Sequence, residues 1–287
     1  MTGTKIVKLK LEGGGDEKLP KLMVEPAIEK ALKLCNSQEL GVYYKFRQSV
    51  IEGSRGFDFD SKQVQKLIYA LEAQHGDDKD YTQKAGVFLS AIMQGSTVKE
   101  FNITVVKPLD WLCYMLEGGK NVTINGTVGA NLGDQMKDGK ITVNGDAGMS
   151  VGNEAFGGRI IVNGNAGEFV GNGMAGGNVL VKGNAAGRAG YKMEAGDITI
   201  AGSCGDGLGQ WMLAGNIHVK KNAGNDTGLG IKGGKLKVDG DVGENTGWNM
   251  EKGIIELGGD YKSLSEDIQG GRILHKGKQI WPVETTR

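Results

Sequence analysis

Two glycine-rich segments have the spacing of a nucleotide-binding loop. Gly171–Gly176 and Gly228–Gly233 both fit the pattern G-x-G-x-x-G, whose backbone can approach a pyrophosphate closely. That chemistry requires a strand before the glycines and a helix that opens after them. Neither segment opens a helical pattern, and both fall at the same phase of a longer repeat. We therefore interpret both as turns, and we expect no cofactor-binding residue in the chain.

The histidines are the next candidates for metal or acid–base chemistry. His75 follows a predicted helix, His218 occupies an outward strand position, and His275 lies near the end of the sequence. None of them has a second His, Cys or acidic residue at the spacing of a metal site, so we expect no bound metal. No Ser, His and Asp set and no Cys and His set can be proposed from spacing alone. We therefore expect no catalytic site in this chain.

The glycine-rich segments belong to a period of 19 residues, which continues without a slip through seven copies. Each copy roughly follows the pattern apolar-x-apolar-x-Gly-x-small-Gly-x-x-apolar-Gly-x-x-Met-x-x-Gly-x. A fixed period of this length is typical of a solenoid, in which each copy forms one coil and buries its apolar face against its neighbours. The copies begin at Val122, Ile141, Ile160, Val179, Ile198, Ile217 and Leu236.

Five positions of each coil predict the interior of a tube. The first and third positions hold Val, Ile or Leu in every copy, as expected for a short strand with one buried face. The seventh, eleventh and fifteenth positions are apolar or small in nearly every copy, and stacking turns each of them into a ladder. The twelfth and eighteenth positions hold only glycine, which we attribute to turns with positive φ. The polar sixth position predicts a hydrogen-bonded ladder rather than a row of calcium ligands.

Both ends of the repeat are degenerate, and an open parallel edge requires a cap. Ile103 to Asn121 resembles a first coil, with Ile103 and Val105 as its two inward strand positions. Ile255 to Ile273 resembles a last coil, and we expect the tail through Trp281 to cover that end. The predicted fold is therefore mostly β: a parallel β-helix of about seven regular coils with degenerate end coils.

The first part of the chain lacks the repeat. We expect a small α-rich (α+β) domain over residues 1–100, followed by the β-helix with its C-terminal cap over residues 101–287. No motif in the N-terminal domain points to chemistry. Its predicted elements are a strand at Ile6–Leu11, a helix that starts at Pro26, a helix that has Ser61 as N-cap and stops by Gly76, and a helix over Asp80–Met93.

Composition and charge narrow the class of protein. Lys plus Arg and Asp plus Glu are both 34, and a net charge near zero argues against a nucleic-acid-binding protein. The N-terminus has no signal-peptide pattern and no apolar stretch is long enough to span a bilayer, so we expect a cytoplasmic protein without a membrane partner. The cysteines Cys35, Cys113 and Cys204 are odd in number and widely spaced, which favours reduced thiols.

One outward position differs from the rest of the repeat. The second position of each coil points outward and is usually polar, but Ile161 and Leu180 occupy it in two adjacent copies. Neighbouring apolar residues on a polar face predict a covered patch. We expect either the N-terminal domain or another protein to cover Ile161 and Leu180, which are therefore our candidate partner-binding residues. The sequence leaves the oligomeric state open.

The coils over residues 163–177 and 183–196 resemble the GXGXG family, because G-x-x-G-x-x-M-x-x-G recurs in phase. This family is the right-handed β-helix found as one subunit of formylmethanofuran dehydrogenase and as the C-terminal domain of the glutamate synthase large subunit. The resemblance covers about residues 120 to 260. It implies a right-handed β-helix that holds catalytic domains or subunits together while the chemistry lies elsewhere. It implies no catalytic residue, because the matched motif carries none.

The leading hypothesis is a non-catalytic scaffold or assembly subunit of a multi-subunit oxidoreductase, whose partners are the catalytic subunits of that complex. Two alternatives remain. One is a stand-alone protein-binding β-helix module. The other is a β-helix enzyme of the acyltransferase type, but such enzymes stack coils on a six-residue sub-repeat of about 18 residues a turn, which disagrees with the observed period.

Overall fold

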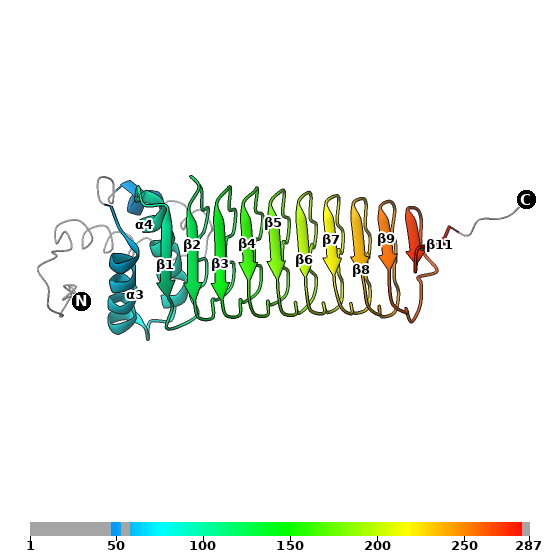
Figure 1. Cartoon of the computed structure of the whole chain (residues 1–287), viewed down its shortest axis with the longest axis horizontal. Coiled ribbons are helices and arrows are strands. Elements are labelled where there is room, and N and C mark those ends of the chain that lie inside the picture. The colour runs from blue at the N-terminus through cyan, green and yellow to red at the C-terminus, as the bar shows by residue number, and fades with distance from the viewer. Residues whose placement is uncertain (1–46, 53–57, 283–287) are drawn as a thin grey trace, which may run out of the picture.

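The structure is a computed structural model that describes residues 47–52 and 58–282. It contains an 11-stranded sheet whose strands follow one another in chain order from β1 to β11. Every strand from β1 to β9 runs parallel to the next, and the coils stack into a straight rod (Figure 1). The predicted strand at Ile6–Leu11, the helix from Pro26 and Cys35 lie outside the described residues.

Each coil gives only four or five residues to the sheet before it turns. From β2 to β9 the neighbouring strands are in register at one period, so Ile141, Ile160 and Val179 are direct neighbours, as the repeat predicted. The fold is a parallel β-solenoid of about 9 turns with about 19 residues a turn. The strands are β1 (Glu100–Thr104), β2 (Asn121–Asn125), β3 (Lys140–Asn144), β4 (Arg159–Val162), β5 (Asn178–Val181), β6 (Asp197–Ile200), β7 (Asn216–Val219), β8 (Lys235–Val238), β9 (Ile254–Leu257), β10 (Arg272–His275) and β11 (Lys278–Trp281).

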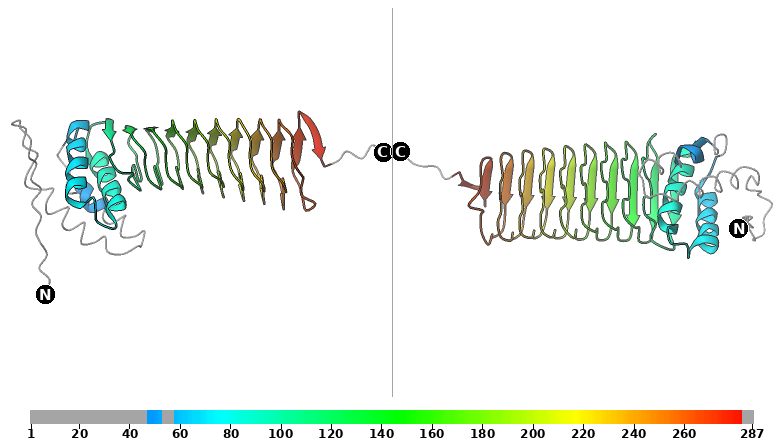
Figure 2. Two further views of the ribbon diagram at one scale, coloured as in Figure 1. Left: turned by 90° about the horizontal axis from the view of Figure 1, so that it is seen from below. Right: turned by 180° about the vertical axis from the view of Figure 1, so that it is seen from behind.

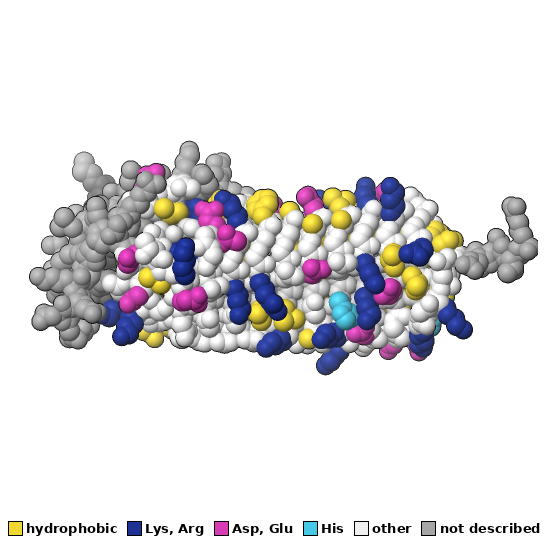
Figure 3. All heavy atoms as spheres, turned by 45° about the horizontal axis from the view of Figure 1, so that its top comes forward, with side chains coloured by type: hydrophobic (Ala, Val, Ile, Leu, Met, Phe, Trp, Pro, Cys, Tyr) yellow, Lys and Arg dark blue, Asp and Glu magenta, His cyan; other side chains and the backbone are white. Residues whose placement is uncertain are grey.

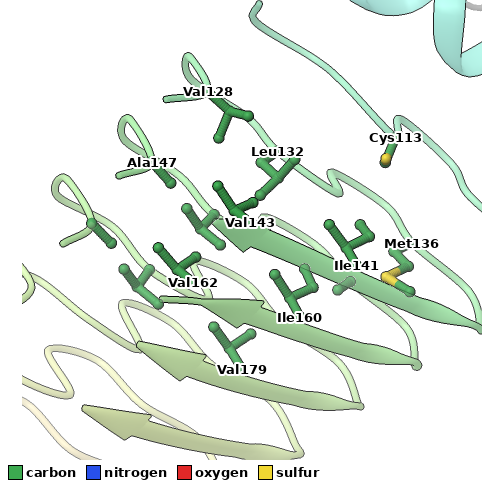
Figure 4. Close-up of a cluster of buried hydrophobic side chains, with 14 of the residues drawn as sticks. Cys113, Val128, Leu132, Met136, Ile141, Val143, Ala147, Ile160, Val162 and Val179 are labelled. Atoms are coloured by element: carbon green, nitrogen blue, oxygen red, sulfur yellow. The ribbon is translucent and has the colours of Figure 1, made fainter. Parts of the chain in front are cut away.

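Ladders of aliphatic side chains fill the interior of the solenoid. The first, third, seventh, eleventh and fifteenth positions are buried in all seven regular coils, which confirms the prediction from the repeat. Figure 4 shows Ile141, Ile160 and Val179 stacked along one row, with Val143 and Val162 beside them. Isolated bridges and backbone hydrogen bonds also join successive coils outside the strands, so the coils are connected around most of their circumference.

Two physical reasons explain why only glycine occurs at the twelfth position, and positive φ is only one of them. Positive φ also occurs at the tenth and fourteenth positions of the same corner, where Arg188 (φ 51°) and Lys192 (φ 53°) carry ordinary, exposed side chains. A side chain at the twelfth position would instead point inward. A Cβ atom on Gly171 (φ +66°) would lie 2.4 Å from Cδ1 of Ile198. Turn geometry alone therefore does not explain the column, because the filled interior also excludes a side chain there.

The sixth position forms the predicted polar ladder along one corner of the coils. Oδ1 of Asp146 accepts a hydrogen bond from the backbone N of Asn165 (2.7 Å), and Oδ1 of Asn165 accepts from the backbone N of Asn184 (2.9 Å). The same bond continues at later coils and ends with Asp241, whose Oδ1 accepts from the backbone N of Asp260 (2.8 Å). These side chains satisfy backbone donors of the next coil, which is a structural role.

Two helices close the N-terminal end of the solenoid (Figures 1 and 2). They are α3 (Ser61–His75) and α4 (Tyr81–Gly95), preceded by a helical segment over residues 47–52. The buried side chains of both helices and of the coils form one continuous apolar core. Both helices were expected from the sequence. No helix in the described part of the chain is long and apolar enough to cross a bilayer.

The predicted ends of these helices need small corrections. The N-cap of α3 is Asp60 rather than Ser61, because Asp60 Oδ1 accepts from the backbone N of Gln63 (2.8 Å) and Gln63 Oε1 accepts from the backbone N of Asp60 (2.8 Å). This reciprocal pair is a capping box. α4 runs to Gly95, two residues beyond the predicted end at Met93, and Ser96 is its C-cap.

Side chains of α3 hydrogen-bond to the open edge of β1. Gln65 pairs with the backbone of Thr104 in both directions: its Oε1 accepts from Thr104 N (2.6 Å) and its Nε2 donates to Thr104 O (2.9 Å). The Oγ atom of Ser61 accepts from Asn102 N (2.9 Å). The helix thus occupies backbone groups that would otherwise be available to another strand.

The first and last coils depart from the period in opposite directions. Phe101 pairs with Val122 and Ile103 pairs with Ile124, so the inward positions of β1 are Phe101 and Ile103 rather than Ile103 and Val105. This coil spans 21 residues, so counting back one period from Val122 misses the true register by two.

At the other end, Ile255 pairs with Ile273 after only 18 residues. β11 then folds back antiparallel to β10, which confirms that the tail through Trp281 covers this end.

Candidate functional site

The outward side chains of β1 to β8 form a continuous flank, which we call the strand face. They are the first, third and fifth residues counted from the start of each strand, and they alternate with buried residues. The third residues in order are Asn102, Thr123, Thr142, Ile161, Leu180, Thr199, His218 and Lys237. This row is polar except at its centre.

Ile161 and Leu180 form an apolar strip at the centre of the strand face. They are register partners of β4 and β5, and both are partly exposed. The strands on either side place Thr142 and Thr199 at the same level. Helices α3 and α4 pack at the β1 end of the rod, three strands away, rather than over this strip (Figure 1). Figure 3 shows small groups of apolar side chains scattered among charged ones along the rod.

His218 belongs to a charged cluster on the same face. Its Nε2 atom lies 2.7 Å from Oδ2 of Asp239, and Nζ of Lys237 lies 2.9 Å from Oδ1 of Asp239. Partial burial tends to raise the pKa of Asp239, but the hydrogen bonds from Lys237 and His218 outweigh it and hold that pKa below its usual range.

These acid partners of the histidines were not expected from the sequence. Asp239 is 21 residues from His218, and Nε2 of His275 similarly lies 3.8 Å from Oδ1 of Asp260. In a solenoid the neighbour of a side chain lies about one period away rather than three or four residues away. The residue one period after His218 is Lys237, its neighbour on the next strand. Asp239 is two residues further along and lies on the same side of that strand.

A shallow hollow of about 170 Å³ lies beside His218 on β6 to β8. Its volume is below the several hundred Å³ of ordinary cofactor pockets. Its lysines and His218 are in ion pairs, since Nζ of Lys235 lies 2.8 Å from Oε1 of Glu256 and Asp239 pairs with Lys237 and His218, while Asp197 accepts a hydrogen bond from Asn216. The hollow could hold a small polar group, but no hydrogen bond joins the Thr199 hydroxyl to the neighbouring His218 there. Its lining residues are Asp197, Ile198, Thr199, Asn216, Ile217, His218, Lys235 and Lys237.

The remaining motifs from the sequence lie in structural positions. Gly171 (φ +66°) and Gly228 (φ +76°), which start the two G-x-G-x-x-G segments, are both at the twelfth position of a coil, in turns that no helix follows. Cys204 is buried at an inward position, and burial raises its pKa to about 11. Cys113 is buried as well, at the corner of the first coil, and burial raises its pKa further. Neither thiol is placed as a nucleophile.

A buried carboxyl group was not expected from the sequence. Asp134 is 1% exposed, and its Oδ2 accepts from Nδ2 of Asn153 (2.9 Å), whose Oδ1 accepts from Asn172 (2.6 Å). Oδ1 of Asp134 has no hydrogen-bond partner among the residues described. Burial raises the pKa of Asp134 to about 7, against the opposing effect of the bond from Asn153. Solvent does not reach this group, so it has no access to a substrate.

Several large apolar side chains are exposed in the corners of the coils. They are Met149 (52%), Phe156 (59%), Leu213 (45%) and Trp248 (45%). No two of them are in adjacent coils at the same position, unlike Ile161 and Leu180. Single exposed apolar residues are common on protein surfaces and do not define a site.

Within residues 47–52 and 58–282, no group of three or more His, Cys, Asp or Glu side chains is arranged to hold a metal ion. Neither a comparison with protein-family models nor one with curated proteins gives a match to this sequence.

Proposed function

We propose that this protein is a non-catalytic scaffold in a multi-subunit oxidoreductase, of the kind to which formylmethanofuran dehydrogenase and glutamate synthase belong. The observation that carries the proposal is the apolar strip of Ile161 and Leu180 on an otherwise polar strand face. Apolar neighbours at the surface of a rod favour contact with another chain. The glycine and methionine pattern of the coils, which resembles the GXGXG family, supports this kind of complex.

The body of the solenoid suits a scaffold better than an enzyme. Aliphatic ladders fill its interior, so a substrate has no room inside the coils. Bonds between coils run around the circumference, which fixes the spacing of groups along the flank. The hollow beside His218 is small, and its lysines and His218 are in ion pairs. The function therefore rests on what the surface holds in place.

The test isolates the tagged full-length protein from its own cells and identifies the proteins that accompany it. We expect catalytic subunits that carry flavin, iron–sulfur or molybdopterin groups, and oxidoreductase activity in the isolated assembly. The purified chain alone should show no turnover. The variant Ile161→Lys with Leu180→Lys should lower the mass of the assembly. The matched control Phe156→Lys with Leu213→Lys makes the same change at exposed apolar residues elsewhere, and it should not.

Turnover by the chain alone would overturn the proposal. So would an assembly that contains no redox subunit, which would indicate a stand-alone binding module instead. Equal effects of the two double variants would show that the strip is not a specific contact.

A further inference from the structure

The strand face has a charge pattern that fits a second copy of itself. We propose that two copies of this chain dock strand face to strand face, with their rods antiparallel and the two-fold axis between Ile161 and Leu180. This inference rests on the proposed role of the apolar strip as an assembly contact, and it names the chain that covers the strip.

The geometry follows from the two-fold axis. An axis parallel to the strands keeps each position along a strand but reverses the order of the coils, so β4 faces β5 of the other copy and β3 faces β6. Ile161 then meets Leu180 of the second copy, and Leu180 meets Ile161. Thr142 and Thr199 meet one coil further out on each side. The apolar contact is closed on itself, with four side chains at its centre.

The charges on the two sides of the axis are complementary. Lys140 and Asp197 are the first residues of β3 and β6, so each faces the other across the interface. Both are exposed, and within the described part of their own chain neither forms an ion pair, although Asp197 Oδ1 accepts from Asn216 Nδ2 (2.9 Å). At the outermost strands Glu100 faces Lys235, although Lys235 also pairs with Glu256 in its own chain.

The other charged residues of the strand face meet neutral partners. Under this axis Arg159 faces Asn178, and Lys182 faces Asn163. Further out, His218, Lys220, Lys237 and Asp239 face Thr123, Asn125, Asn102 and Thr104. The antiparallel arrangement therefore places no like charges against each other anywhere from β1 to β8.

A parallel arrangement is less complementary, because it opposes Lys235 to Asp239 but also places like charges against each other. An axis along the rod leaves each strand facing its own copy in the opposite direction, so the third residue of every strand meets itself. Lys237 would face Lys237 and, one strand beyond the strand face, Glu256 of β9 would face Glu256. Like charges held opposite each other are unfavourable, so the charge pattern selects the antiparallel dimer.

The size of the face predicts a weak dimer. Eight strands spaced about 4.8 Å apart, each about 15 Å long, give on the order of 500 Å² per copy and about 1,000 Å² in total. This is the lower end of specific interfaces, which begin at about 1,000–1,200 Å². We therefore expect a dimer that dissociates on dilution.

The test uses sedimentation velocity of the full-length protein across a dilution series. The wild type should pass from dimer to monomer. Lys140→Asp alone places Asp against Asp twice, and Asp197→Lys alone places Lys against Lys twice, so each should raise the dissociation constant about tenfold or more. The double variant with both changes should restore the wild-type constant. Lys262→Asp, which reverses an exposed lysine outside the strand face, should leave it unchanged.

Mixing the two single variants gives a sharper result. A Lys140→Asp chain and an Asp197→Lys chain are complementary only in an antiparallel pair, so native mass spectrometry should show the mixed dimer in excess over either homodimer. Both variants change exposed residues, and unchanged melting temperatures will show that they fold.

A wild type that stays monomeric at every concentration would overturn the inference, as would a dimer whose single variants are not rescued by mixing. Neither result affects the scaffold proposal, which depends on redox subunits in the assembly isolated from cells. Conversely, a rescued dimer without redox subunits would support the pairing and reject the oxidoreductase role.

Discussion

Gly190 faces Ile217 across the interior corner of the solenoid, and a Cβ atom on Gly190 would lie 2.1 Å from Cδ1 of Ile217. Ile217 belongs to the second strand after Gly190 in the chain, so close packing at this point connects the coil of Gly190 with a later coil. The glycine column is therefore part of the core packing as well as of the turn.

The first prediction separates these two roles of glycine. Gly190→Ala should lower the free energy of unfolding by roughly 1–2 kcal/mol for its left-handed backbone and by about 1–3 kcal/mol more for overpacking. Gly207→Ala is the matched control, because Gly207 has nearly the same φ (+73° against +71°) but its Cβ would meet Arg188 Cγ at 3.2 Å, in a flexible side chain. Chemical denaturation should show the smaller loss for Gly207→Ala. Equal losses would mean that backbone strain alone explains the column.

The second prediction concerns the pH dependence of Asp134. Its pKa of about 7 in the folded protein lies above the ordinary value of 3.8, so its contribution to stability is fully present below pH 3.8 and is lost as the pH rises to about 7. Asp134→Asn removes this loss. The free energy of unfolding of the variant relative to the wild type should therefore increase between pH 4 and pH 8, by up to about 1.4 kcal/mol per pKa unit.

The control for that series is Asp146→Asn. Asp146 is exposed, and its Oδ1 accepts the same backbone bond that Asn165 accepts in the next coil. Its variant makes the same change from carboxyl to amide at the surface, and it measures the effect of the substitution itself. A flat difference for Asp134→Asn would show that this carboxyl group is not held neutral.

The third prediction compares two buried threonines of the eleventh position. Oγ1 of Thr227 donates to Gly224 O (3.2 Å), whereas Oγ1 of Thr246 has no partner among the described residues. Thr246→Val should raise the free energy of unfolding by about 1–3 kcal/mol, because it removes an unsatisfied polar group. Thr227→Val should be neutral or destabilising. The opposite order in thermal unfolding would contradict the assignment.

The fourth prediction concerns the capped edge of β1. Gln65→Ala leaves the backbone N–H and C=O of Thr104 without the two bonds they now form, and it should cost about 1–3 kcal/mol. The exposed neighbour Lys66→Ala is the control. Amide hydrogen exchange at Thr104 should accelerate only in the Gln65 variant. Unchanged exchange would show that the helix, rather than this side chain, protects the edge.

Most of the fold could be predicted from the repeat, because each position of the coil occurs seven times in the same environment. Ile141 and Ile160 occupy equivalent positions, so their burial and stacking followed from the period alone. The first coil has no such redundancy. Because this coil has two extra residues, its inward positions are Phe101 and Ile103. The sequence before it does not repeat, so the insertion could not be recognised by comparison with another copy.

The contacts between different parts of the chain were harder to foresee. Gln65 on α3 binds the backbone of Thr104, which is 39 residues away, and an amide on a helix surface carries no sign of that role. The pair of His218 and Asp239 could have been found from the sequence, since the period places them in adjacent coils. The strip of Ile161 and Leu180 was found because it breaks the pattern of its own column.

The constant register from β2 to β9 makes this chain a ruler. Each coil lengthens the rod by about 4.8 Å, so the distance between two side chains at the same position of different coils is a whole multiple of that spacing. Such a protein can lengthen or shorten by whole coils without changing the environment of the residues that remain. The 21-residue first coil and the 18-residue step from Ile255 to Ile273 show that a change of one or two residues is instead absorbed within its own coil. The distance between two partners bound at the same position of different coils is therefore set by the number of periods between their binding residues.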